Sequence, residues 1–214
     1  MSPRRAKVLS EESSPGALRR HLIVVTQRLL AAHGGMVLTT RQIAREAQVS
    51  AGVLYNHFHD KDDLVVTALV AQATQNAATF LAAVPEPGSG TLEENLSALA
   101  DAALALLASA LPLVASVFGQ ARAFHDLVTA MHSDPGPLQP FLATVEYLRA
   151  EQALGRVAPD ADPNAAVELL FGACQLRAFV VALQPLGVAS PTGGSNATQD
   201  LTAVVATLAR SLRP

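Results

Sequence analysis

Apolar residues recur at intervals of three and four along most of this chain, which is the repeat of one face of an α-helix. The first stripe falls within residues 17–33 and consists of Leu18, Leu22, Val25, Leu29 and Ala32. Gly34 and Gly35 follow it, and glycine commonly ends a helix because it adopts a positive φ without strain. No stretch of the sequence alternates with period two for long enough to predict a sheet. The pattern therefore predicts an all-α protein.

The same spacing, interrupted by clusters of proline, glycine and serine, predicts eight more helices. They cover residues 40–47, 51–57, 61–84, 91–109, 112–131, 136–155, 163–184 and 197–212. Thr39 and Gln42 have the spacing of a capping box, and Asp60 is placed to cap the long helix that follows it. Pro112 is expected to separate two helices, and the Asp-Pro pair at 162–163 to begin another.

Composition agrees with a helical protein of the cytoplasm. Half of the residues are hydrophobic but only 4% are aromatic, so the apolar content is mainly Ala, Leu and Val. Ala and Leu are strong helix formers. The single cysteine, Cys174, excludes an intrachain disulfide and a cysteine-rich metal site. No apolar run near the N-terminus resembles a signal peptide.

Charge is distributed unevenly along the chain. Residues 1–61 contain nine Lys/Arg and four Asp/Glu, a net charge of +5, whereas the remainder contains six and fourteen, a net charge of −8. A basic end on an acidic body indicates that the N-terminal region meets a polyanion.

One segment is long enough to raise a membrane-spanning alternative. Residues 102–120 carry no charge over nineteen positions, a length that could cross a bilayer. However, they include six alanines, two serines and Pro112, and Asp101 and Arg122 lie close to the two ends. Alanine makes a poor lipid-facing surface and a good tightly packed core, so we expect a buried helix and no membrane partner.

The segment that indicates function is residues 38–64, LTTRQIAREAQVSAGVLYNHFHDKDDL. Two short helices can cross closely where Ala44 and Ala47 meet, and Leu54 and Phe58 can seat the second helix on the first. Ser50 is placed to cap the second helix. The residues then left outward on it are small or uncharged: Ser50, Ala51, Gly52, Val53, Tyr55, Asn56 and His57. Such a surface suits a helix that enters the major groove of DNA.

In this segment, IA-x-EA-x-VS followed by LY-x-HF-x-x-K-x-x-L closely resembles the DNA-binding signature of the TetR family of repressors. Residues 1–16 are polar, with two prolines, Gly16 and four serines, and we expect them to form a flexible basic arm. The resemblance implies a three-helix helix-turn-helix domain at 17–62 and a helical ligand-binding and dimerisation domain at 63–214. Many members carry glycine where this chain has Gln48, and a left-handed backbone there would cost Gln48 about 1 kcal/mol.

The resemblance also assigns candidate DNA contacts. The positions implied to contact or adjoin phosphates are Thr40, Ser50, Tyr55, His57 and Lys61. Those implied to face bases are Ala51, Gly52 and Val53, and Val53 could touch a thymine methyl group. Arg41 could reach a guanine edge or bind phosphate, and the sequence leaves both open.

The C-terminal part predicts a homodimer through helices near 163–184 and 197–212. The helix at 163–184 is apolar on more than one face, and its small residues Gly172, Ala173 and Cys174 would allow close approach of a second helix. The alternative is a central helix in a monomeric core. A helix-turn-helix reader needs a dimer, because two half-sites roughly 34–36 Å apart must be held together.

The sequence gives weaker evidence for an effector pocket than for the helix-turn-helix. Polar residues among apolar neighbours could orient a small, largely apolar effector, and they are Asn76, Gln120, Arg122, His125, His132, Tyr147 and Gln175. Each of them could equally be an ordinary satisfied polar group. His125 and His132 share a helix face, but with no nearby cysteine or paired acid we predict no metal site and no cofactor.

The sequence thus predicts a transcriptional repressor that is released from a palindromic operator by a small-molecule effector. A ligand-independent regulator and a transcriptional activator of the same fold are the alternatives. We expect no enzyme, since no nucleophile elbow, phosphate loop, HExxH motif or paired-carboxylate arrangement occurs in the sequence.

Overall fold

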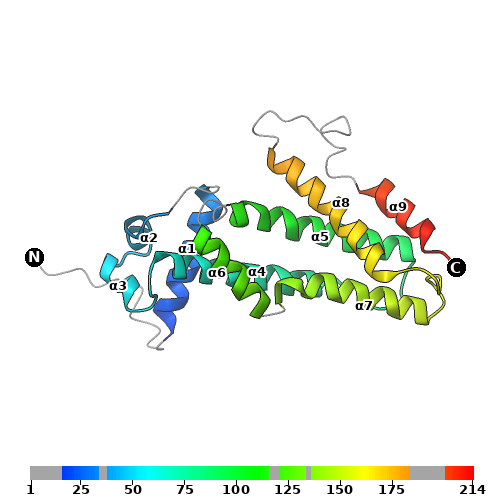
Figure 1. The fold of residues 1–214 in the computed structure, drawn as a ribbon, viewed down its shortest axis with the longest axis horizontal. Helices are drawn as coiled ribbons and strands as arrows, with labels where there is room; N and C mark the ends of the chain where they lie inside the picture. The colour runs from blue at the N-terminus through cyan, green and yellow to red at the C-terminus, as the bar shows by residue number, and fades with distance from the viewer. Residues whose placement is uncertain (1–15, 34–37, 116–120, 134–135, 184–200) are drawn as a thin grey trace, which may run out of the picture. The chain divides into compact units, whose positions relative to one another are not determined.

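The computed structural model describes residues 16–33, 38–115, 121–133, 136–183 and 201–214. All regular structure in these ranges is helical, as the predicted fold class requires (Figure 1). The elements are α1 (Ala17–His33), α2 (Thr40–Glu46), α3 (Ala51–Tyr55), α4 (Lys61–Leu81), α5 (Leu92–Ala115), α6 (Ala121–Ser133), the 3₁₀ turn η2 (Gly136–Leu138), α7 (Gln139–Ala153), α8 (Pro163–Leu183) and α9 (Thr202–Ser211). The arm predicted at 1–16 lies outside the described residues, apart from Gly16.

Most predicted helices are confirmed, and the clearest error concerns Pro112. Proline was expected to separate two helices, but α5 runs through it to Ala115. Proline has no N–H and so costs the helix one backbone hydrogen bond, but only one turn of α5 follows Pro112, and most of the helix lies before it. The next helix accordingly begins at Ala121 and not at residue 112. Smaller differences are the earlier ends of α3 and α4, at Tyr55 and Leu81.

The chain folds into two compact units. Unit 1 comprises Met1–Ala73 and Pro112–Asp134, and unit 2 comprises Thr74–Leu111 and Pro135–Pro214. The grouping differs from the predicted division after residue 62, because the start of α4 and the whole of α6 fall in unit 1.

The core of unit 1 is built by one face of each of its helices. Its most deeply buried members are Leu22 of α1, Ile43 of α2, and Leu64 and Ala68 of α4, all with no exposed surface. Ala123 and Leu127 of α6 are buried in the same cluster. Burial of this kind stabilises by roughly 1.5–3 kcal/mol per large side chain, so α6 is an integral part of unit 1.

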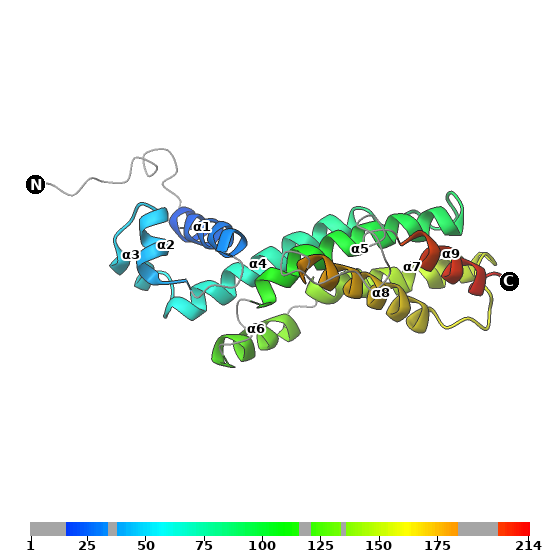
Figure 2. The same ribbon diagram turned by 90° about the horizontal axis from the view of Figure 1, so that it is seen from above.

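Unit 2 has a separate core, contributed by the end of α4 and by α5, α7, α8 and α9 (Figure 2). Phe171 of α8 lies between Phe80 of α4 and Phe141 of α7, with ring centroids 5.8 and 5.7 Å away. These tilted and edge-on arrangements are the favourable ones for aromatic pairs. The C-terminal end is tied in by the Ala158 N–H, which donates to the Leu212 carbonyl (2.9 Å).

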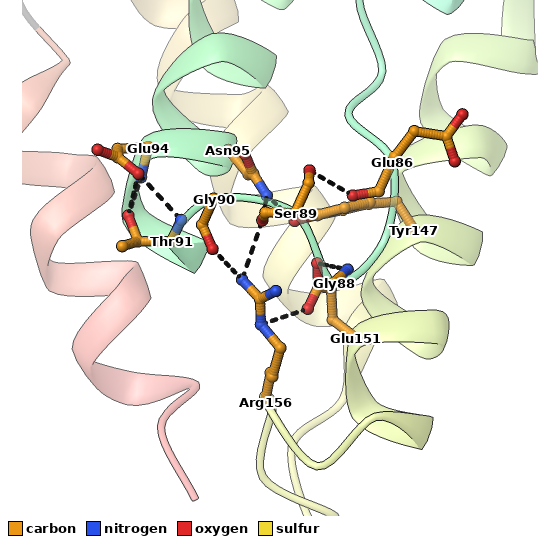
Figure 3. Close-up of polar contacts among 10 residues, drawn as sticks. All are labelled: Glu86, Gly88, Ser89, Gly90, Thr91, Glu94, Asn95, Tyr147, Glu151 and Arg156. Atoms are coloured by element: carbon orange, nitrogen blue, oxygen red, sulfur yellow. Dashed lines mark hydrogen bonds and ion pairs between the residues drawn. The ribbon is translucent and has the colours of Figure 1, made fainter.

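A polar cluster holds the turn between α4 and α5 in unit 2 (Figure 3). Asn95 Nδ2 donates to the Ser89 carbonyl (2.8 Å) and to Tyr147 Oη (2.9 Å). The Gly88 N–H donates to Glu151 Oε1 (3.0 Å). Gly88 has φ +85°, a conformation that favours glycine, so both the backbone shape and the polar contacts define this turn.

Three helices are long and apolar enough to cross a membrane by length and composition, namely Lys61–Leu81, Leu92–Leu111 and Pro163–Leu183. Each of them also places side chains in a protein core. Leu64 of α4, Leu99 of α5 and Leu170 of α8 have no exposed surface.

Candidate nucleic-acid interface

Helix α2 begins with the capping box that the sequence predicted. The Gln42 N–H donates to Thr39 Oγ1 (3.2 Å), and the Thr39 N–H donates to Gln42 Oε1 (2.8 Å). This exchange satisfies two backbone donors that the helix start would leave unpaired. Ile43 and Ala44 are buried, so Arg41 is turned outward and exposed.

The turn after α2 has the left-handed backbone that the sequence suggested. Gln48 has φ +57° and is the one non-glycine with positive φ in the described part of the chain. The Val49 N–H donates to the Ala44 carbonyl (2.9 Å), which closes the turn. A side chain in this region costs roughly 1 kcal/mol, so the chain adopts this turn with some strain.

Helix α3 is short and is seated on unit 1 by two apolar residues. Leu54 and Phe58 are 3% and 4% exposed, and the Phe58 N–H donates to the Leu54 carbonyl (2.9 Å). Ser50 occupies the N-cap position with extended backbone, but its side chain makes no capping bond. The predicted cap is therefore wrong for the hydroxyl, which stays exposed at the start of the helix.

The opposite face of α3 is open. Tyr55 is 57% exposed, and nothing lies within 4 Å of the Cβ position of Gly52. None of the nine predicted DNA contacts is buried: Thr40, Arg41, Ser50, Ala51, Gly52, Val53, Tyr55, His57 and Lys61. The predicted inward packing of Leu54 and Phe58 is confirmed. Of the candidate contacts, Arg41, Ser50, Gly52 and Tyr55 are exposed, whereas Ala51 is half-buried and packs against the core of unit 1.

The start of α4 is organised by an acidic pair. The Asp63 N–H donates to Asp60 Oδ1 (2.8 Å), and the His59 N–H donates to Asp63 Oδ2 (2.8 Å). The hydrogen bond from the Asp63 N–H is the main reason that the pKa of Asp60 lies below its ordinary value of 3.8. Desolvation raises this pKa, but the His59 side chain and the charge of Arg122 lower it further. Lys61 Nζ pairs with Asp62 Oδ1 (3.0 Å). The predicted cap at Asp60 is confirmed.

Sequence comparison identifies the fold. The model of the family "Bacterial regulatory proteins, tetR family" matches residues 22–68, which contain α2, α3 and the start of α4. The helix-turn-helix segment of this chain is therefore of the TetR type. An HTH-type transcriptional regulator, HbdR of Aromatoleum sp. (strain CIB), is 44% identical over 52 residues. That match spans 24% of this chain and only 23% of the length of the curated relative.

Solved TetR-like structures share the fold over almost the whole chain. A TetR-family transcriptional regulator of Mesorhizobium loti MAFF303099 has a TM-score of 0.75 at 19% identity, with 95% of this chain and 100% of that one covered. The fatty acid degradation regulator FadR of Bacillus halodurans covers 94% and 95% with a TM-score of 0.61 at 17% identity. FadR of Bacillus subtilis, solved with stearoyl-CoA, covers 91% and 100% with a TM-score of 0.59 at 15% identity.

The candidate effector residues of this chain divide between the two units. Arg122 and His125 lie on α6 in unit 1 and are exposed. Arg122 Nη2 pairs with Asp60 Oδ2 (3.4 Å) and its Nε with Asp126 Oδ2 (3.8 Å). Gln120 and the side chain of His132 lie outside the described residues. The sequence did not anticipate that Arg122 would pair with the cap of α4.

The other three candidates lie in unit 2. Asn76 donates to Ser109 Oγ (2.9 Å) and lines a cavity of about 320 Å³ between α4 and α5, with Thr79, Phe80, Ala83, Ala102, Ala105, Leu106 and Ser109. Tyr147 is buried, and burial raises its pKa to about 12, with the Glu151 side chain adding to the rise. Gln175 is exposed on α8. Within the described ranges, no group of three or more His, Cys, Asp or Glu could hold a metal ion.

Helix α8 presents large apolar side chains to solvent. Leu169, Leu176 and Phe179 are 67%, 56% and 48% exposed, and their spacing places them on one face. Gly172 lies on this face with open space around its Cβ position. The predicted small-residue patch is only partly correct, because Cys174 is turned into the core of unit 2, where its thiol donates to the Ala100 carbonyl (3.5 Å).

Proposed function

We propose that this TetR-family protein is a DNA-binding transcriptional regulator whose α3 enters the major groove. The observation that carries the proposal is that α3 has one face packed on unit 1 and one face open to solvent. Leu54 and Phe58 hold it on unit 1, while its outer surface bears no charged or bulky aliphatic side chain. A helix of this kind can approach base edges closely.

In the proposed complex, the edges of the interface hold the phosphate backbone. Hydroxyls of Thr40, Ser50 and Tyr55 donate to phosphate oxygens, and Lys61 and His57 add positive or polar contacts. Ala51, Gly52 and Val53 face the bases, and Val53 can contact a thymine methyl group. Arg41, exposed at the start of α2, reaches a guanine edge or a phosphate.

We further propose a homodimer that buries the exposed face of α8 together with α9. Three large apolar side chains on one helix face are costly to leave in water, at about 25 cal/mol per Å² of apolar surface. Gly172 on the same face would allow close helix approach. A symmetric pair would present two α3 helices to successive turns of a palindromic operator.

The proposed regulation is release of the operator by a small, largely apolar effector in the cytoplasm. Two features support it. Helix α4 contributes residues to both units, so a change at its end in unit 2 can be transmitted to unit 1. The cavity beside Asn76 is lined mainly by apolar groups, and the fold relative FadR of Bacillus subtilis was solved with an acyl-CoA. A coupling of about 1–3 kcal/mol would lower operator affinity 5- to 150-fold.

The test is a mobility-shift assay with the duplex upstream of the protein's own gene, with and without a panel that includes stearoyl-CoA. Binding that is lost with an apolar ligand supports the repressor, and in vitro transcription from the same duplex separates repression from activation. Binding that is unchanged across the panel favours a ligand-independent regulator. Failure to bind duplex DNA at low salt would overturn the proposed function.

A further inference from the structure

Arg19 of α1 is stacked on the residue that anchors the recognition helix. Its Cζ lies 4.9 Å from the centroid of the Phe58 ring. Phe58 is 4% exposed, whereas Arg19 is exposed. Arginine stacked on an aromatic face keeps its planar N–H donors directed outward, available to an acceptor outside the protein.

Phe58 places this guanidinium at the end of α3. The Phe58 N–H donates to the Leu54 carbonyl, and the His57 N–H donates to the same carbonyl at 3.0 Å. Phe58 therefore directly follows the candidate contacts Tyr55 and His57 and precedes Lys61 by three residues. Arg19 reaches the same part of unit 1 from a different helix.

The stem of α1 is fixed against the helix-turn-helix by two further contacts. His21 Nε2 lies 3.3 Å from the Ala47 carbonyl at the end of α2. Gln27 Nε2 donates to the Ala68 carbonyl of α4 (3.2 Å). Because these contacts hold α1 against α2 and α4 at two positions that follow Arg19, the helix that carries the guanidinium is positioned before any ligand arrives, which lowers the entropy cost of binding.

The charge of Arg19 has no acidic partner in the part of the chain that the structure describes, and its guanidinium stacks on the Phe58 ring. Exposed arginines in a region of net charge +5 commonly neutralise phosphates. Neither the signature at 38–64 nor the family match at 22–68 includes this residue.

We propose that Arg19 is a further phosphate contact, one that extends the interface from α3 to the start of α1. The guanidinium would bind a backbone phosphate at the rim of the major groove next to the phosphates contacted by Tyr55 and Lys61. This inference rests on the proposed function, since it requires that α3 docks on duplex DNA.

The experiment compares Arg19→Met with Arg28→Met in the full chain. Methionine keeps an unbranched apolar stem over Phe58 but removes the charge. Arg28 is also exposed on α1, and nine residues are about 2.5 helical turns, so its side chain leaves the opposite side of the helix. Binding of a short labelled duplex of arbitrary sequence is measured by fluorescence anisotropy between about 50 and 200 mM salt.

We expect Arg19→Met to weaken binding and to flatten the plot of log K against log salt by about 0.9 per protomer, and Arg28→Met to leave the slope unchanged. Arg19→Lys should keep most of the slope but bind more weakly, since it lacks the planar fork. Thermal unfolding of each variant checks that unit 1 is intact. If the parent binds and Arg19→Met behaves like Arg28→Met, this inference is wrong while the proposed function stands. If the parent does not bind duplex DNA, both fail.

Discussion

Arg156 and Glu151 form an ion pair of 3.0 Å in unit 2, although the Glu151 side chain has no exposed surface. Arg156 also donates through Nη2 to the carbonyls of Ser89 (3.1 Å) and Gly90 (2.7 Å). A buried carboxylate is costly unless it is paired and hydrogen-bonded. The pair therefore ties the end of α7 to the turn between α4 and α5.

Replacing Arg156 by Ala should leave the buried carboxylate of Glu151 without its positively charged partner. We expect a loss of about 3 kcal/mol in the free energy of unfolding, measured by urea denaturation. The control is Arg149→Ala, which breaks the exposed pair with Glu146 and should cost less than about 1 kcal/mol. Equal losses of unfolding free energy in the two variants would mean that the burial of Glu151 does not increase the contribution of its ion pair to stability.

Gln48→Gly should stabilise the protein by about 1 kcal/mol, because glycine adopts φ +57° without strain. DNA affinity should stay the same, since the backbone of the turn does not change. The matched control is Gln75→Gly in the middle of α4, where glycine should instead destabilise by about 1 kcal/mol. A loss of stability in Gln48→Gly would argue against the left-handed turn.

Tyr55→Phe removes only an exposed hydroxyl, and Lys61→Ala removes one charge at the start of α4. Both should weaken binding on all duplex sequences alike, because phosphate contacts carry no sequence information. Lys61→Ala should also reduce the salt slope by about 0.9 per protomer. Binding titrations across salt concentrations test this, and parental behaviour of both variants at every salt would refute the docking of α3.

Asp60→Asn tests the charge at the cap of α4. The folded-state pKa of Asp60 lies below 3.8, so its carboxylate stabilises the fold at neutral pH, and that stabilisation is lost as the pH falls through the folded pKa. Parent and variant should therefore differ in unfolding free energy above pH 4 and converge at more acidic pH. The same pH dependence in both proteins would assign the cap no electrostatic role.

Leu176→Glu should weaken the proposed dimer, because it places a charge on the exposed apolar face of α8. Leu154 is similarly exposed, at 57%, and lies outside α8, so Leu154→Glu is the matched control. Analytical ultracentrifugation should show dissociation of the first variant at concentrations where the parent and the control remain dimeric. A monomeric parent would overturn the dimer proposal.

Local patterns in the sequence predicted the helix-turn-helix well. Hydrophobic spacing and the capping box at Thr39 depend on residues within one or two turns of each other, so they can be read without the fold. The left-handed turn at Gln48 was suggested by the family resemblance, because many members carry glycine at this position, and its φ of +57° agrees with that suggestion.

Features that depend on distant contacts could not be read in this way. Glu151 and Arg156 form hydrogen bonds with the backbone of Gly88 and Ser89, which lie more than sixty positions away along the chain. Pro112 was misjudged because a local rule predicts a break, whereas α5 continues to Ala115. The ion pair between Arg122 and Asp60 was not predicted, because the two residues lie far apart along the chain.

The membership of α6 in unit 1 has a practical outcome for protein engineering. A fragment that stops after Ala73 would lack Ala123 and Leu127, which fill part of the core around Leu22 and Leu64. Its remaining helices would expose the apolar side chains that α6 covers in the full chain. Such a fragment should precipitate or self-associate when expressed alone. We therefore expect that the helix-turn-helix segment does not fold on its own. Fusions and domain exchanges should include the segment from Pro112 to Asp134 together with it.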